Sequence, residues 1–174
     1  MITAIDNLLN RVTMYRLVSY ILIALLVSSG VLAWFGAFPF TPLSLAFSAC
    51  VIFAVSWIGN RIFAWSFDAP SNPESTWITA LTLALIITPP SSWQDARFWA
   101  LAIWASLWAI ASKFIFARGR KHFFNPAAFG VATTALCLGF AASWWIATLW
   151  SAPLVLIGAL LIVRKIRRFD LWLA

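Results

Sequence analysis

The sequence predicts an all-α membrane protein, a polytopic bundle of about six transmembrane segments. Two observations carry this prediction: 63% of the 174 residues are hydrophobic, and only 10% are charged. An average soluble domain is about 45–50% apolar and about 25% charged, so the surface of this chain does not suit water. At roughly 20 residues per membrane crossing plus short loops, the length allows about six crossings and no soluble domain.

The apolar runs follow one another with short polar breaks. They cover about residues 17–35, 42–63, 76–88, 98–116, 125–142 and 147–163, and we number them segments 1 to 6. Segments 3 and 5 are shorter than the roughly 20 residues that a crossing needs. Residues 1–16 carry Asp6, Arg11 and Arg16 and are expected to form a cytoplasmic amphipathic N-terminus on the membrane surface.

The basic residues predict the topology. The net charge of +7 would indicate nucleic acid in a soluble protein, but here the charges lie between apolar runs, so no nucleic-acid partner is expected. With a cytoplasmic N-terminus and six crossings, every Lys and Arg except Arg97 faces the cytoplasm, as does the C-terminus. If segments 3 and 5 were re-entrant loops, the basic cluster after segment 4 would face outside, which is the less favourable arrangement.

Two short motifs are candidates for chemistry. Asn72-Pro73 precedes segment 3, and Asn125-Pro126 opens segment 5. Asn is a common helix cap, and Pro suits the first turn of a helix. A helix N-terminus that is buried in a bundle offers its free N–H groups to an anionic or polar ligand. The simpler alternative is two ordinary caps in loops. Thr79 belongs to a row of hydroxyls in segment 3 that either bond to neighbouring helices or line a cavity.

The sequence contains no pattern for a self-contained active site. No acidic residue lies deep in a segment, so a proton relay is not expected. Cys50 and Cys137 lie inside apolar runs and are interpreted as small apolar fillers. No metal-ligand spacing, paired nucleophile and base, or phosphate-binding loop is visible, so we assign no catalytic residue and no metal ligand.

Segments 3 and 5 resemble the RnfD/NqrB family. TALTLAL at residues 79–85, followed by Pro89-Pro90, resembles that family's "TGLLLAL…PP" run, and FNPAA at residues 124–128 resembles its "PFNPAM". These proteins are membrane subunits of the Rnf and sodium-pumping NADH:quinone oxidoreductase complexes, with a ten-helix fold of two inverted repeats. The resemblance implies that residues 17–170 form the first repeat and that residues 171–174 start a truncated further helix.

The same resemblance implies a membrane-embedded subunit or domain of a flavin-linked electron-transport system of the bacterial inner membrane, with ion transport as a coupled activity. A non-covalent flavin, FMN or riboflavin, would then bind near five residues: Asn72, Pro73, Thr79, Asn125 and Pro126. The redox partner would be other subunits or a fused flavin- and NAD-binding reductase domain. Such a chain is part of an oxidoreductase complex rather than an enzyme by itself.

The sequence departs from the family in three places. Residues 118–122 read RGRKH where the family has a Gly-rich approach with a further Asn. The family's insertion with an S-x-A-T motif for covalent FMN is missing; Ala147-Thr148 is the nearest approach, and Trp145 replaces the Ser, so covalent FMN is not expected. The family's second half is absent as well.

Two alternatives stay open. The chain could be half of a channel or transporter for a small polar solute, which completes its pore as a homo-oligomer. It could also be a passive anchor for a fused reductase.

Overall fold

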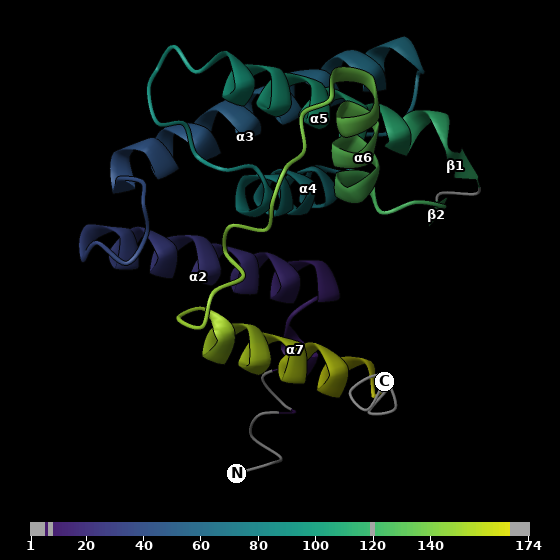
Figure 1. Cartoon of the computed structure of the whole chain (residues 1–174). Coiled ribbons are helices and arrows are strands. Elements are labelled where there is room, and N and C mark those ends of the chain that lie inside the picture. The colour runs from purple at the N-terminus through teal and green to yellow at the C-terminus, as the bar shows by residue number, and fades with distance from the viewer. Residues whose placement is uncertain (1–5, 7–8, 119–120, 168–174) are drawn as a thin grey trace.

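The computed structural model describes residues 6, 9–118 and 121–167. Its elements (Figure 1) are helices α2 (Met14–Trp34), α3 (Pro42–Ser66), α4 (Pro73–Ile86), α5 (Ala96–Ile115), α6 (Pro126–Leu138) and α7 (Ala152–Ile166), with the short strands β1 (Ala117–Arg118) and β2 (Lys121–His122). The strands pair as an antiparallel hairpin between α5 and α6. The predicted helical bundle is therefore confirmed in outline.

Among the described residues, three helices are long and apolar enough to cross a membrane: α2, α3 and α5, with 21, 25 and 20 residues. At 1.5 Å per residue each reaches about the 30 Å of a hydrocarbon core. These helices and the composition make the chain a membrane protein. α4, α6 and α7 have only 14, 13 and 15 residues.

Segments 3 and 5 are short helices, as predicted, but segment 6 differs from its prediction. Residues 147–163 were expected to form an ordinary crossing, whereas α7 begins only at Ala152. The apolar run there begins with turns because the Ser151 hydroxyl accepts from the Thr148 N–H and donates to the Ile146 and Thr148 carbonyls. Such local side-chain bonds compete with helix formation.

Caps and prolines decide where the other helices begin. The side-chain oxygens of Thr41, Asn72 and Asn125 accept backbone N–H bonds at the starts of α3, α4 and α6, and each helix has Pro at the following position. A proline at the first helical position loses nothing, because that N–H has no partner inside the helix. α6 ends at Gly139, whose φ of 68° lies in the left-handed region that glycine adopts without strain.

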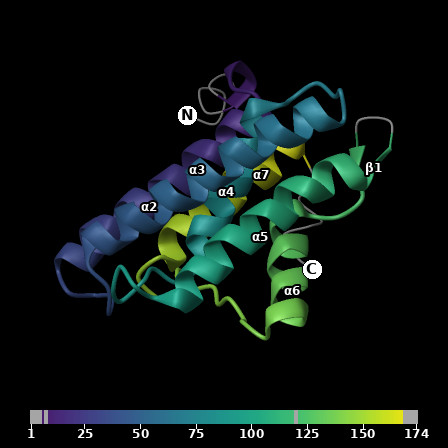
Figure 2. The same cartoon turned by 90° about the horizontal axis from the view of Figure 1, so that it is seen from above.

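Five of the helices run along a common direction, and α6 crosses them steeply (Figures 1 and 2). α7 packs on α2, α2 packs on α4, and α4 packs on α3, which in turn contacts α5. α6 packs mainly against α5. The bundle is thus layered from α7 to α5, and α6 closes the side next to α5.

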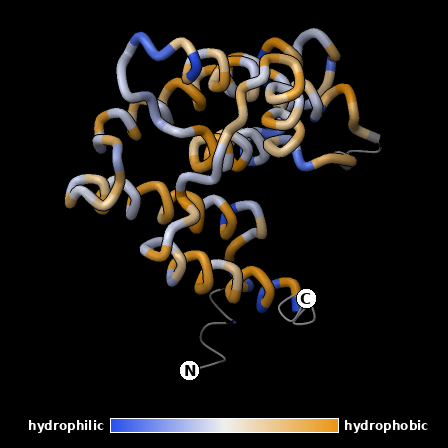
Figure 3. The backbone as a smooth tube through the Cα atoms, in the orientation of Figure 1, coloured by the Kyte–Doolittle hydropathy of each residue, from blue (hydrophilic) through white to orange (hydrophobic). Residues whose placement is uncertain are grey.

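One end of the bundle, which we call the basic end, gathers most of the described positive charges. It contains the N-terminal turns of α2 and α4 and the C-terminal turns of α3, α5 and α7 (Figure 1). The described basic residues in these turns are Arg16, Arg61, Lys113, Arg164 and Lys165, and Arg167 is the C-cap of α7. Arg97 lies at the opposite end, where its guanidinium donates to the Ala141 carbonyl. Figure 3 shows hydrophobic stretches along the helices and hydrophilic ones at chain turns.

An ion pair ties the N-terminal region to the basic end. The Arg164 guanidinium donates to both carboxylate oxygens of Asp6, at 2.7 and 3.1 Å. The hydrogen bond from Arg164 lowers the pKa of the Asp6 carboxyl below its usual 3.8.

This pairing predicts a pH effect. A carboxyl with a lowered folded-state pKa stabilises the protein above its unfolded pKa, and the effect is lost as the pH falls through the folded value. We therefore expect a small decrease in the thermal unfolding midpoint of the detergent-solubilised protein as the pH is lowered below the usual carboxyl pKa of 3.8. Asp6→Asn should remove this part of the pH dependence, and an unchanged pH profile in that variant would contradict the assignment.

Small side chains form the interface between α3, α5 and α6. Buried alanines of α5, among them Ala102, Ala105 and Ala109, face Ile52 of α3 and Ala127 of α6. Small residues let backbones approach closely where lipid offers no hydrophobic driving force. The two cysteines do not contribute to this core: Cys50 and Cys137 are free and exposed, so their interpretation as fillers was wrong.

A second cluster joins α2 to the chain that follows α6. Trp145 packs edge to face against Phe38 and Phe40, whose ring centroids lie 5.6 and 4.9 Å from the indole. The Trp145 indole N–H also donates to the Ala84 carbonyl near the end of α4, at 3.1 Å. Trp145 therefore fixes the irregular chain between α6 and α7 to the bundle.

Candidate functional site

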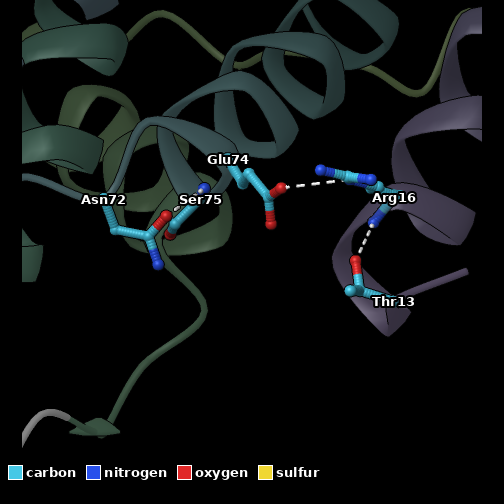
Figure 4. A network of polar contacts seen from close by, with 5 residues as sticks. All are labelled: Thr13, Arg16, Asn72, Glu74 and Ser75. Carbon is cyan, nitrogen blue, oxygen red and sulfur yellow. Dashed lines mark hydrogen bonds and ion pairs between the residues drawn. The ribbon is translucent and has the colours of Figure 1, made fainter.

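The start of α4 lies at the basic end, within a network of polar contacts (Figure 4). The Asn72 side-chain oxygen accepts from the Ser75 N–H at 3.3 Å, which caps the helix. Beside it, Glu74 forms an ion pair with Arg16 of α2 at 3.4 Å, and the Thr13 hydroxyl caps α2 by accepting from the Arg16 N–H. The predicted residues Asn72 and Pro73 are both exposed here.

Buried polar side chains of α3 and α5 approach the same helix start. The Asn60 amide, on α3, donates to the Ser71 hydroxyl at 2.6 Å. Lys113, on α5, donates to the Ser75 carbonyl at 2.8 Å and to its hydroxyl at 3.1 Å. Asn60 is 3% exposed and Lys113 is 8% exposed. We call Asn60, Ser71, Asn72, Ser75 and Lys113 the α4-start cluster.

Lys113, like Asn60, was missed by the sequence analysis. It was counted only as one more cytoplasmic charge, although an ionisable side chain inside an apolar helix is a candidate functional residue. No carboxylate pairs with it in the part of the chain that the structure describes. Its position near the end of α5 also suits a lysine whose long stem is buried while its amine reaches the membrane surface.

The Thr79 side chain makes its hydrogen bond within α4 and not to another helix. It is 5% exposed, and its hydroxyl donates to the Ser75 carbonyl one turn earlier in α4, at 2.9 Å. Thr82 likewise donates to Ile78 of its own helix. Of the two alternatives for these hydroxyls, bonding to neighbouring helices is not observed for either residue, because each hydroxyl donates to a carbonyl within α4.

The start of α6 is a second capped helix start. The Asn125 side-chain oxygen accepts from the N–H groups of Ala127 and Ala128 at 3.1 and 3.4 Å. Asn125 is exposed and Pro126 is half-buried. Both Asn-Pro motifs therefore act as helix caps, as the simpler interpretation predicted.

The five predicted site residues thus form two groups. Asn72, Pro73 and Thr79 belong to α4, whereas Asn125 and Pro126 begin α6. α4 and α6 contact one another, and Ala127 shares the core with Ala80. Within the described ranges, no hydrogen bond or ion pair joins the two groups.

No known family model, curated protein or solved structure matches this chain. The resemblance to RnfD/NqrB proteins therefore rests on the motifs at residues 79–90 and 124–128 and on their order. Among the described residues, no group of His, Cys, Asp and Glu could hold a metal ion.

The two helix starts offer hydrogen-bond donors rather than acids or bases. Each cap uses the side-chain oxygen, and the amide NH₂ groups of Asn72 and Asn125 donate no hydrogen bond within the described residues. Lys113 adds a positive charge next to the start of α4, where the helix dipole is positive as well. This set of groups suits carbonyl oxygens and anions.

Proposed function

We propose that this chain is a membrane-embedded subunit or domain of a flavin-linked electron-transport system, similar to RnfD/NqrB proteins. The observation that carries the proposal is the pair of short helices, α4 and α6, each started by Asn-Pro in the order of that family. The α4-start cluster adds a buried lysine beside the first of them. Short helices whose N-termini face a ligand are a recurring design of membrane binding sites.

In this proposal the chain's own residues hold the flavin without a covalent bond. The amides of Asn72 and Asn125 would serve as hydrogen-bond donors to it, and Lys113 would offset negative charge. The flavin, when bound, supplies the electron-accepting and electron-donating chemistry. Thr148 has no place in this arrangement, since its hydroxyl is buried and the neighbouring Trp145 is packed against Phe38 and Phe40.

The proposed topology has six crossings, with both termini and the basic end in the cytoplasm of a bacterial cell. Positive charge is retained on the cytoplasmic side of the inner membrane, and the basic end holds Lys113 of α5 and the described Lys and Arg residues of α2, α3 and α7. In this topology the fifth crossing is broken. It consists of α6 and the irregular residues 139–151 that lead to α7.

The broken crossing also favours a subunit role. In the described part of the chain, the backbone N–H groups of residues 140–144 donate no hydrogen bond. An unpaired backbone group in lipid costs several kcal/mol, so irregular backbone at membrane depth is normally covered by protein. Leu136 and Leu149, on either side, are 87% and 92% exposed. We propose that a redox partner, another subunit or a fused reductase domain, covers this surface.

The test is spectroscopic. The protein purified in detergent should show the visible absorption of a flavin that denaturation releases, because the attachment is non-covalent. Asn125→Ala should lose most of this flavin. Thr41→Ala is the matched control: it removes the cap of α3 in the same way, away from both Asn-Pro starts, and should keep the flavin.

A folded, colourless protein that releases no flavin on denaturation would contradict the proposal. If that protein were oligomeric and carried a small polar solute into liposomes, the channel-half alternative would replace it.

A further inference from the structure

A groove on the outer surface between α3 and α4 has no role in the function proposed above. Its volume is about 260 Å³. Three aromatic rings and three smaller side chains line it: Phe53, Trp57, Trp77, Ala54, Thr76 and Ala80. The Thr76 hydroxyl donates its hydrogen bond to the Asn72 carbonyl, so it offers no free donor to a ligand in the groove. The surface of the groove is therefore suited to a hydrocarbon chain.

The groove has a direction. α3 and α4 are antiparallel, so Trp57 and Trp77 lie nearer the basic end, whereas Phe53 and Ala80 lie deeper. Phe53 and Trp77 stack edge to face, with centroids 5.9 Å apart, across the two helices. A chain entering from the membrane surface at the basic end would lie along Trp57 and reach these rings.

Arg61 follows Trp57 by one helical turn towards the basic end. Its guanidinium lies over the Trp57 ring, 5.1 Å from the centroid. Its side chain is exposed. In the part of the chain that the structure describes, the ion pairs involve Arg16 and Arg164, so no described carboxylate neutralises Arg61. A positive charge therefore stands at the mouth of an apolar groove.

We propose that this groove binds an anionic phospholipid, with its phosphate at Arg61 and one acyl chain along Trp57 and Trp77. A lipid in the cytoplasmic leaflet matches this arrangement, because its charged headgroup lies at the membrane surface and its acyl chains point towards the bilayer centre. The stacked arginine and indole hold the charge at the level of the headgroups, where tryptophan is favoured. The charge of Arg61 thus favours an anionic lipid over a zwitterionic one. The apolar groove favours a lipid over free phosphate, because only a lipid has an acyl chain to place in it.

Native mass spectrometry of the detergent-purified protein tests the proposal. We expect phosphatidylglycerol to be retained in preference to phosphatidylcholine of the same chains. Arg61→Gln should weaken phosphatidylglycerol binding about fivefold, the effect of roughly 1 kcal/mol per basic residue near a membrane surface. Arg11→Gln is the matched control, since it removes the same charge from an exposed side chain, away from the groove, and should change little.

A second variant tests the groove separately from the charge. Ala54 is exposed and lines the groove, so Ala54→Phe should fill it without disturbing the core. Ala54→Phe should also weaken phosphatidylglycerol binding, while helical content by circular dichroism stays unchanged. Equal binding of both lipids, equal loss in Arg11→Gln, full binding in Ala54→Phe, or displacement by glycerol phosphate would each overturn the proposal.

Discussion

Replacing Gly130 by alanine is expected to destabilise the protein by about 3 kcal/mol, the upper range for over-packing a core. Gly130 lies where α6 crosses α5, and a Cβ added there would lie 2.3 Å from the Ala105 carbonyl oxygen. It would also lie 2.8 Å from the Ala109 Cβ and 2.9 Å from the Ala109 N. These atoms belong to a helix backbone or are fixed to it, so the two helices must separate.

The measurement is the unfolding of the detergent-solubilised protein, followed by far-ultraviolet circular dichroism. Gly30→Ala is the control, because a Cβ at Gly30 has as its nearest neighbour a Leu45 methyl at 3.7 Å. Alanine is the better helix former by about 1 kcal/mol, so Gly30→Ala should be neutral or stabilising. Equal stability of Gly130→Ala and the unmodified protein would mean that α6 does not pack closely against α5.

Replacing Trp145 by alanine should cost about 3 kcal/mol, as is usual when a large aromatic side chain leaves a packed cluster. The indole is packed against Phe38 and Phe40, and its N–H donates to the Ala84 carbonyl. Its loss would release the chain between α6 and α7, which has few hydrogen bonds of its own among the described residues.

Two further variants separate the contributions of the ring and the N–H group. Trp145→Phe keeps an aromatic ring and loses the hydrogen bond, so it should cost only about 1 kcal/mol. Trp150→Ala is the control, because Trp150 is 68% exposed and forms no ring contact among the described residues. If Trp145→Ala and Trp150→Ala unfold alike in the same denaturation assay, the packing role of Trp145 is wrong.

The local signals in the sequence were sufficient for the starts of α3, α4 and α6. Pro42, Asn72-Pro73 and Asn125-Pro126 mark the beginnings of α3, α4 and α6, because a cap and a proline act within one turn of chain. The end of α6 and the start of α7 were not predicted. Residues 139–151 are as apolar as a helix, and only the contacts of Trp145 and Ser151 with distant or neighbouring backbone show that they are irregular.

The candidate site was predictable only in part. The two Asn-Pro motifs were found from the sequence, and both act as caps. Lys113 and Asn60 were missed, because only the packing of α3 and α5 against α4 brings their side chains to Ser71 and Ser75. A lysine or asparagine in an apolar run is the signal that could have identified them.

The sidedness of single cysteines tests the proposed six-crossing topology most directly. In a background with Cys50 and Cys137 replaced by serine, one cysteine is introduced at exposed Asn10, Ser91 or Ala147, and spheroplasts are treated with a membrane-impermeant maleimide. The proposed topology predicts labelling at positions 91 and 147, and labelling at position 10 only after lysis. Position 147 labelled only after lysis would show that α6 and residues 139–151 do not cross the membrane, and would contradict the account.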